Sequence, residues 1–190
     1  VQYGSVDELL ADMRYFDGLT DIYLNSHSID SCESNALDYF ANLKQLSLSK
    51  NKLKFVEKSL LANQISLKNL DLSFNLISRV DDDAFKSLAN LESLYLNNNQ
   101  LKSITSNHFR SLVKLKFLHL SDNQISSLND DPMDKLFGSS LQSLIELHLN
   151  KNQIAKLNEN QFARLLQLRN LYLDRNLIDT LDQPLFAKSR

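Results

Sequence analysis

The sequence predicts a solenoid in which every repeat adds one short strand to a parallel sheet. Residues 91–101, Leu-Glu-Ser-Leu-Tyr-Leu-Asn-Asn-Asn-Gln-Leu, set a template that six other segments match. The seven copies start at Leu19, Leu43, Leu67, Leu91, Leu115, Leu144 and Leu168. The period is 24 residues except for one step of 29 residues, and a fixed period of this kind indicates a repeat array.

Each copy opens with leucines that alternate with polar residues, as Leu70 and Leu72 do around Asp71. This period of two predicts a short, half-buried strand. The connections of about twenty residues are too long for tight hairpins, so the strands should lie parallel, one per turn. We therefore expect about seven short strands in one sheet.

The ninth position of the copies is an amide in six cases of seven, with His27 as the exception. The six amides are Asn51, Asn75, Asn99, Asn123, Asn152 and Asn176. The strand ends at this position and the chain turns, which leaves N–H and C=O groups that need partners. A carboxamide both donates and accepts hydrogen bonds, so we interpret the column as a structural Asn ladder without a catalytic role.

The remaining segments are read as parts of the same single domain, 1–190. Residues 1–18 are expected to form an incomplete repeat, in which Ser5 and Glu8 resemble a capping box that opens a short helix through Glu8, Leu9, Leu10 and Met13. The fifth copy carries five extra residues within 129–138, which should form a loop outside the sheet. The array stops inside a copy, so we expect a fragment of a longer array whose uncapped ends favour self-association.

The full pattern, LxxLxLxxNxL with an apolar residue three positions further on, resembles the leucine-rich repeat family over residues 19–186. Several copies also carry a phenylalanine eighteen residues after their start, at Phe85, Phe109, Phe162 and Phe186. This spacing is similar to the 24-residue "typical" subclass, which in animals occurs mainly in secreted and cell-surface proteins. The resemblance implies an α/β fold, a curved right-handed horseshoe. Its parallel strands would lie on the concave side, and its turns, short helical segments and a Phe spine on the convex side.

The composition of the chain argues against several classes of function. The formal net charge of −2 argues against a nucleic-acid partner, and no apolar run is long enough to span a membrane. Three glycines exclude the usual phosphate-binding loops, and no nucleophile with an adjacent base is visible, so neither an enzyme nor a cofactor is expected. The single cysteine, Cys32, occupies an apolar position that points inward, which predicts a structural thiol.

The residues between the strand leucines should face the concave surface. The column four residues after each start reads Tyr23, Ser47, Asp71, Tyr95, His119, His148 and Tyr172. Strands lie about 4.8 Å apart, so neighbours in this column should form a continuous patch. The predicted partner-binding residues are Tyr95, Phe117, His119, His148, Tyr172, Phe74, Asp71 and Glu146. The alternative is that they are ordinary exposed strand residues.

His119 and His148 occupy equivalent positions of consecutive strands. Two imidazoles with at most Glu146 nearby fall short of a closed zinc site, so the sequence predicts no metal. Repulsion between the imidazoles opposes double protonation while nearby acids favour it. We therefore expect the pair to titrate as a coupled unit around pH 5 to 7.

The preferred hypothesis is a non-enzymatic recognition array that binds another protein through its concave face. It resembles the repeat regions of Toll-type receptors and other animal innate-immunity or adhesion proteins, which implies an extracellular or cell-surface location. The alternative is a cytoplasmic protein-interaction scaffold, favoured by the single thiol and by the absence of N-x-Ser/Thr sequons and of cysteine clusters. A lipid or glycan binder would need an apolar groove or a polar platform, and only Phe74, Leu76 and Phe117 hint at the groove.

Overall fold

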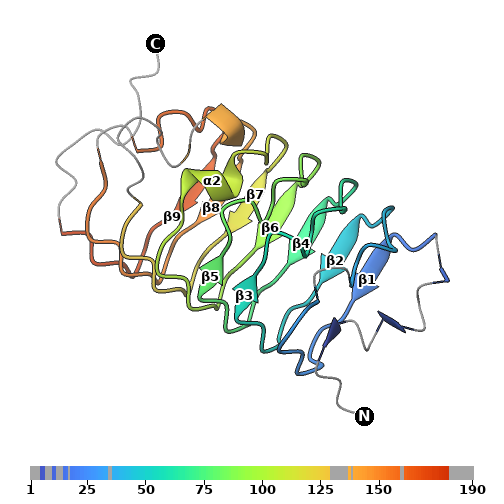
Figure 1. Cartoon of the computed structure of the whole chain (residues 1–190). Helices are drawn as coiled ribbons and strands as arrows, with labels where there is room; N and C mark the ends of the chain where they lie inside the picture. The colour runs from blue at the N-terminus through green and yellow to red at the C-terminus, as the bar shows by residue number, and fades with distance from the viewer. Residues whose placement is uncertain are drawn as a thin grey trace.

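A computed structural model describes residues 5, 6, 10, 11, 15, 16, 18–33, 36–128, 137, 139–158 and 161–179. Within them, seven strands of three residues form one parallel sheet in sequence order (Figure 1). They are β1 (Asp21–Tyr23), β2 (Gln45–Ser47), β4 (Asn69–Asp71), β6 (Ser93–Tyr95), β7 (Phe117–His119), β8 (Glu146–His148) and β9 (Asn170–Tyr172). The strand occupies the third to fifth positions of every copy. The predicted solenoid with a parallel sheet is therefore confirmed.

The sheet keeps one register along its whole length. The buried middle residue of each strand lies opposite that of the next, as Leu70 lies opposite Leu94. A slip by one residue would turn these leucines to solvent, so the alternating pattern specifies the register. The 29-residue step does not disturb it, because Leu118 and Leu147 are still paired. The longer fifth copy thus keeps the pairing of the strands on either side of it.

The return segments contain little regular structure. A second, two-stranded sheet pairs β3 (Phe55–Val56) with β5 (Arg79–Val80), which the alternation of apolar residues does not predict. The described helices are the single turns α2 (Ser106–Phe109) and η2 (Ser139–Leu141). None of the described helices has the length and apolar character needed to cross a membrane. Of the expected helix opening at Ser5, Val6 and Leu10 are described and helical, whereas Glu8, Leu9 and Met13 lie outside the described residues, as does most of 129–138.

The core is one continuous cluster that runs along the solenoid. Its largest buried side chains are the phenylalanines Phe40, Phe85, Phe109, Phe137 and Phe162. The expected Phe spine is therefore present at Phe85, Phe109 and Phe162, while Phe186 lies outside the described residues. Phe137, from the longer fifth copy, stacks on Phe162 with ring centroids 5.5 Å apart. Cys32 is half-buried against the same core.

The Asn side chains at the ends of the strands join successive turns. Asn99 Nδ2 donates to the carbonyl of Leu72 in the preceding turn at 3.0 Å and to that of Leu96 in its own turn at 3.1 Å. Its Oδ1 accepts the N–H of Ile77 at 2.9 Å. Equivalent bonds are made by Asn51, Asn75, Asn123, Asn152 and Asn176. Each amide thus satisfies backbone groups of two turns at once.

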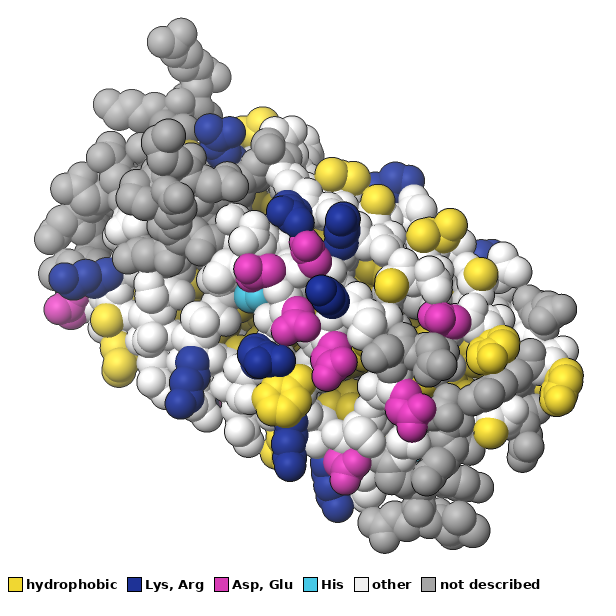
Figure 2. All heavy atoms as spheres, viewed as in Figure 1, with side chains coloured by type: hydrophobic (Ala, Val, Ile, Leu, Met, Phe, Trp, Pro, Cys, Tyr) yellow, Lys and Arg dark blue, Asp and Glu magenta, His cyan; other side chains and the backbone are white. Residues whose placement is uncertain are grey.

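The side of the molecule that carries α2 is polar and mixed in charge. Figure 2 shows Lys and Arg side chains interspersed with Asp and Glu over its middle. Asp83 pairs with Arg110, Asp81 lies 3.5 Å from the Arg79 guanidinium, and the Thr105 hydroxyl donates to Asp82 at 3.2 Å. The three consecutive acids 81–83 are therefore engaged with neighbouring side chains, as in a solvated turn.

Candidate functional site

The sheet register places the predicted central residues in one line across the concave surface. Tyr23, Ser47, Asp71, Tyr95, His119, His148 and Tyr172 each lie opposite the next. Their exposure varies along the line. Tyr23 is 60% exposed and Tyr172 40% exposed, whereas Ser47 is buried. The side chains in this line are thus exposed to solvent at its aromatic ends and buried near β2.

Four rings from β6 to β9 pack face against face. The centroids of Tyr95 and His119 are 4.8 Å apart, those of His119 and His148 3.9 Å, and those of His148 and Tyr172 4.1 Å. The last two pairs are nearly parallel, at 16° and 17°. We call Tyr95, His119, His148 and Tyr172 the ring stack. Because each ring stands on a strand and is held by its neighbours, the stack is a preorganised surface.

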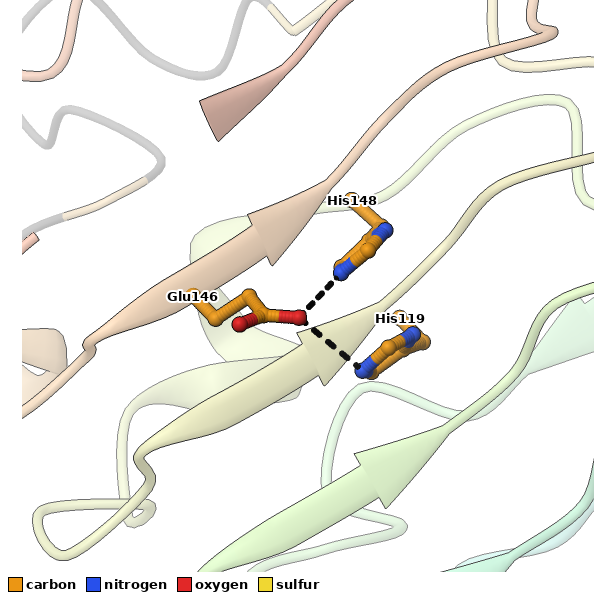
Figure 3. A group of neighbouring side chains, drawn as sticks. All are labelled: His119, Glu146 and His148. Atoms are coloured by element: carbon orange, nitrogen blue, oxygen red, sulfur yellow. Dashed lines mark hydrogen bonds and ion pairs between the residues drawn. The ribbon is translucent and has the colours of Figure 1, made fainter. Parts of the chain in front are cut away.

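Glu146, at the start of β8, reaches across the edge of this stack. Its Oε1 accepts a hydrogen bond from His148 Nε2 at 2.5 Å and lies 4.0 Å from His119 Nε2 (Figure 3). Its Oε2 accepts from the Asn170 amide at 3.1 Å. Both carboxylate oxygens are therefore occupied, and Oε1 points between the two imidazoles.

Burial and charge shift the pKa values of this group. Burial is the main cause that lowers the pKa of His119 to about 4; the neighbouring His148 lowers it further, and Glu146 opposes the shift. The hydrogen bond from His148 is the main cause that lowers the pKa of Glu146, with a second contribution from Asn170. The expected titration around pH 5 to 7 is therefore wrong for His119, because the sequence does not reveal how far its ring is desolvated.

The other predicted site residues surround the ring stack at different distances. Phe117 is half-buried on β7, opposite Glu146. Asp71 precedes Tyr95 in the line and accepts hydrogen bonds from the hydroxyls of Ser47 and Ser73. Phe74 lies in the turn after β4, not on the sheet; it is 48% exposed, and the Lys50 ammonium lies 6.0 Å from its ring. Phe74 is therefore at the rim of the concave surface.

A shallow hollow of about 340 Å³ meets the ring stack at Tyr95 and lies over β1, β2, β4 and β6. It is lined by Tyr23, Asn25, Gln45, Leu46, Ser47, Asn69, Asp71 and Tyr95. Sequence reasoning did not single out Asn25, Gln45 or Asn69 as site residues. Polar residues occupy these positions in most copies, so no signal in the pattern distinguishes the hollow from the rest of the sheet.

His108 was not expected to have a role, and the structure gives it one inside the fold. Its Nδ1 accepts the N–H of Thr105 at 3.0 Å, and its Nε2 lies 3.1 Å from the carbonyl of Val80 in the preceding turn. Since Nδ1 accepts, the ring proton is on Nε2, which donates to Val80. His108 therefore links two turns on the side opposite the sheet, as the Asn side chains do at the strand ends.

The chain is similar to known repeat proteins in both sequence and structure. A family model described as "Leucine rich repeat" matches residues 65–125. No curated protein sequence matches the chain. Among solved structures, a leucine-rich repeat protein of Leptospira interrogans superposes with a TM-score of 0.77 at 28% identity over 90% of this chain. The TLR13–ssRNA13 complex gives 0.72 at 29% over 82%, and the internalin InlF of Listeria monocytogenes gives 0.72 at 25% over 90%.

These similarities agree with the fold and with the amide ladder. A solenoid of parallel strands, closed at each turn by an asparagine, defines a class of repeat proteins that act as binding scaffolds. The family match over residues 65–125 and the similar solved structures support the leucine-rich repeat family for this chain. It spans 41% of the Leptospira protein, 21% of the TLR13 chain and 46% of the internalin, so it corresponds to a part of each.

Proposed function

We propose that the chain is a non-enzymatic recognition array that binds another protein through the ring stack and the surface around it. The observation that carries this proposal is the stack itself: four rings on adjacent strands, partly exposed and fixed by their neighbours. Aromatic side chains that are already ordered lose little entropy on binding, which is why they dominate interface hot spots. The hollow beside Tyr95 extends the same surface with hydrogen-bonding groups.

A protein partner fits this surface better than a nucleic acid. The TLR13 structure is a complex with RNA. Here the acidic side chains Asp71, Glu146 and Asp174 stand on or beside the sheet, and the whole chain carries a net charge of −2. RNA binding depends on positive charge opposite the phosphates, which this surface does not concentrate.

The location that we propose is extracellular or at the cell surface. It rests on the resemblance of the 24-residue repeat to the subclass typical of such proteins. A cytoplasmic scaffold remains the second candidate, favoured by the single Cys32 and the absence of sequons. The full-length sequence decides between them, since a signal peptide and flanking cysteine clusters would select the first and their absence the second.

Site-specific photo-crosslinking tests the binding face. A photoreactive phenylalanine analogue is placed either at Tyr172, which is 40% exposed on β9, or at Val113, which is 50% exposed in a turn away from the sheet. We expect a discrete covalent adduct with one protein from position 172 and none from position 113. Adducts from Val113 alone, or from neither position, would move the binding site elsewhere.

The partner so identified then allows a quantitative test. Tyr95→Ala and His148→Ala should each weaken binding by more than about 1 kcal/mol and leave the circular dichroism spectrum unchanged, as expected for central interface residues. Lys58→Ala, at an exposed position outside the sheet, is the control and should bind as the unaltered protein does. Equal affinities for all three variants would exclude the ring stack as the hot spot.

A further inference from the structure

We propose that His119, Glu146 and His148 form a binding site for a divalent transition metal ion of the zinc class. One ligand atom from each residue, two imidazole nitrogens and a carboxylate oxygen, lies within 4.8 Å of the others. They come from the neighbouring strands β7 and β8, and Figure 3 shows the carboxylate directed between the two rings. The site shares His119 and His148 with the ring stack, but it needs no protein partner. From the sequence, no metal is expected here because three ligands fall short of a closed zinc site, whereas three ligands suffice for a site that keeps one position open.

The three ligand atoms favour transition metal ions over Ca²⁺ and Mg²⁺. Two imidazole nitrogens and one carboxylate oxygen suit Zn²⁺ and related transition metals, whereas Ca²⁺ and Mg²⁺ prefer shells made of oxygen. Three protein ligands also leave a coordination position for water or for a ligand group. The side chains are 19–23% exposed, so an ion can reach them from the concave side.

The distances are close to those that a metal needs. Tetrahedral zinc with bonds of about 2.0–2.1 Å holds its ligand atoms about 3.3 Å apart. Glu146 Oε1 is 2.5 Å from His148 Nε2 and 4.0 Å from His119 Nε2, and all three ligand atoms lie within 4.8 Å of one another, so each distance changes by about 1.5 Å or less to reach that spacing. A metal also lies in the plane of each ring that binds it. The two imidazoles, now stacked at 16° with centroids 3.9 Å apart, would therefore turn so that their planes meet at the ion, with the Nε2 atoms converging and the ring centroids moving apart.

The groups around the three ligands support coordination. The Asn170 amide donates to Glu146 Oε2 at 3.1 Å, which orients the carboxylate and leaves Oε1 to face the imidazoles. Such hydrogen bonds to the outer oxygen of a ligand typically change metal affinity by about 10–100-fold. Tyr95 and Tyr172 flank the imidazoles and limit their other orientations. The metal would take the place of the proton that His148 Nε2 now donates to Glu146, and that proton would move to Nδ1, so His148 binds the ion as its other tautomer.

Isothermal titration of tag-free, chelator-treated protein with Zn²⁺ at pH 7.5 tests the site. We expect one ion per chain. Glu146→Gln and His148→Asn should each weaken binding by at least about tenfold, and Asn170→Ala by about tenfold, because it removes only the orienting bond. His27→Asn removes an exposed imidazole outside the cluster and should leave the affinity unchanged.

Two results would overturn the assignment: no Zn²⁺ binding by the unaltered protein, or binding that Glu146→Gln and His148→Asn leave intact. Circular dichroism of each variant shows whether it is folded. If a ligand variant does not fold, Co²⁺ provides the second measurement, because its visible absorption bands report coordination by the folded, unaltered protein. Absence of those bands would equally count against the site.

Discussion

At the scale of single residues, the asparagine at each strand end both donates and accepts hydrogen bonds with the backbone of two turns. Asn99 fills the hydrogen-bonding capacity of three backbone groups in two turns, and its side chain is buried. A buried backbone group without a partner costs more than an ordinary hydrogen bond contributes, so the position tolerates little change.

Asn99→Ala should therefore lower the free energy of unfolding by about 1–3 kcal/mol. Chemical denaturation followed by circular dichroism measures the effect. Gln100→Ala, one residue further on and exposed, is the matched control and should change stability by no more than about 0.5 kcal/mol. An unchanged midpoint for Asn99→Ala would show that water replaces the amide without loss.

Glu92, the residue before strand β6, is a second example of a single side chain that affects stability. Glu92 accepts a hydrogen bond from Lys116 at 2.7 Å, the main cause that lowers its pKa, and Lys68 of the preceding turn lies 3.9 Å away. A carboxyl whose pKa is lowered by folding stabilises the protein above its ordinary value of 4.5. That stabilisation is lost as the pH falls through the folded pKa.

Glu92→Gln should accordingly destabilise the protein by about 0.2–1 kcal/mol at pH 7, because these side chains are well exposed and screened. The difference from the unaltered protein should shrink as the pH falls below 4.5 and should also shrink at high salt. Denaturation midpoints at several pH values measure it, with the exposed Glu57→Gln as control. A difference that stays constant with pH would rule out the ion pair as its cause.

At the scale of elements, the turn after each strand demands an unusual backbone conformation. The residue before each ladder asparagine has a positive φ, close to 55° in Lys50, Phe74, Asn98, Asp122, Lys151 and Arg175. None of these residues is glycine. The left-handed conformation costs an L-residue of order 1–3 kcal/mol, and most when the side chain is β-branched.

Phe74→Ile should therefore destabilise the protein by about 1–3 kcal/mol, whereas Phe74→Gly should lose little or nothing. Phe55 offers a matched control, since it is equally exposed, at 49% against 48% for Phe74, but lies in strand β3. Phe55→Ile should change stability by no more than about 0.5 kcal/mol. If both isoleucine variants behave alike in thermal unfolding, backbone strain does not limit this turn.

At the scale of the whole molecule, the hydrogen bonds between turns join neighbouring turns throughout the described residues. The carbonyl of Leu72, for example, accepts hydrogen bonds from both Asn75 and Asn99. Stability in such an array is approximately a sum of terms for single repeats and for adjacent pairs. The interaction energy between two substitutions should therefore decrease as the number of turns between them increases.

A double-mutant cycle tests this decay. The pair Asn75→Ala and Asn99→Ala should show an interaction energy of at least about 0.5 kcal/mol, because both side chains share one acceptor. Asn51→Ala and Asn152→Ala, which share none, should be additive within about 0.5 kcal/mol. Equal interaction energies in the two cycles would contradict a stability that depends on contacts between adjacent turns.

The sequence by itself determined the frame of this protein. Alternating leucines at a 24-residue period specify where each strand begins and which face is buried, since a shift by one residue would expose every leucine. The repeat pattern alone therefore predicts that the side chains from Tyr23 to Tyr172 lie in one line across the sheet. The purpose of the asparagine column also follows from local chemistry, because a turn at the end of a buried strand leaves backbone groups unpaired.

Only the tertiary structure decided how neighbouring side chains meet. The parallel stack of His119 on His148, the placement of Glu146 Oε1 between their Nε2 atoms and the support from Asn170 depend on rotamers of residues 24 to 29 positions apart. The low pKa of His119 depends on the water excluded by that stack. A repeat pattern specifies the backbone and the direction of each side chain, but the contacts among the variable residues arise from packing between turns, which a periodic pattern does not encode.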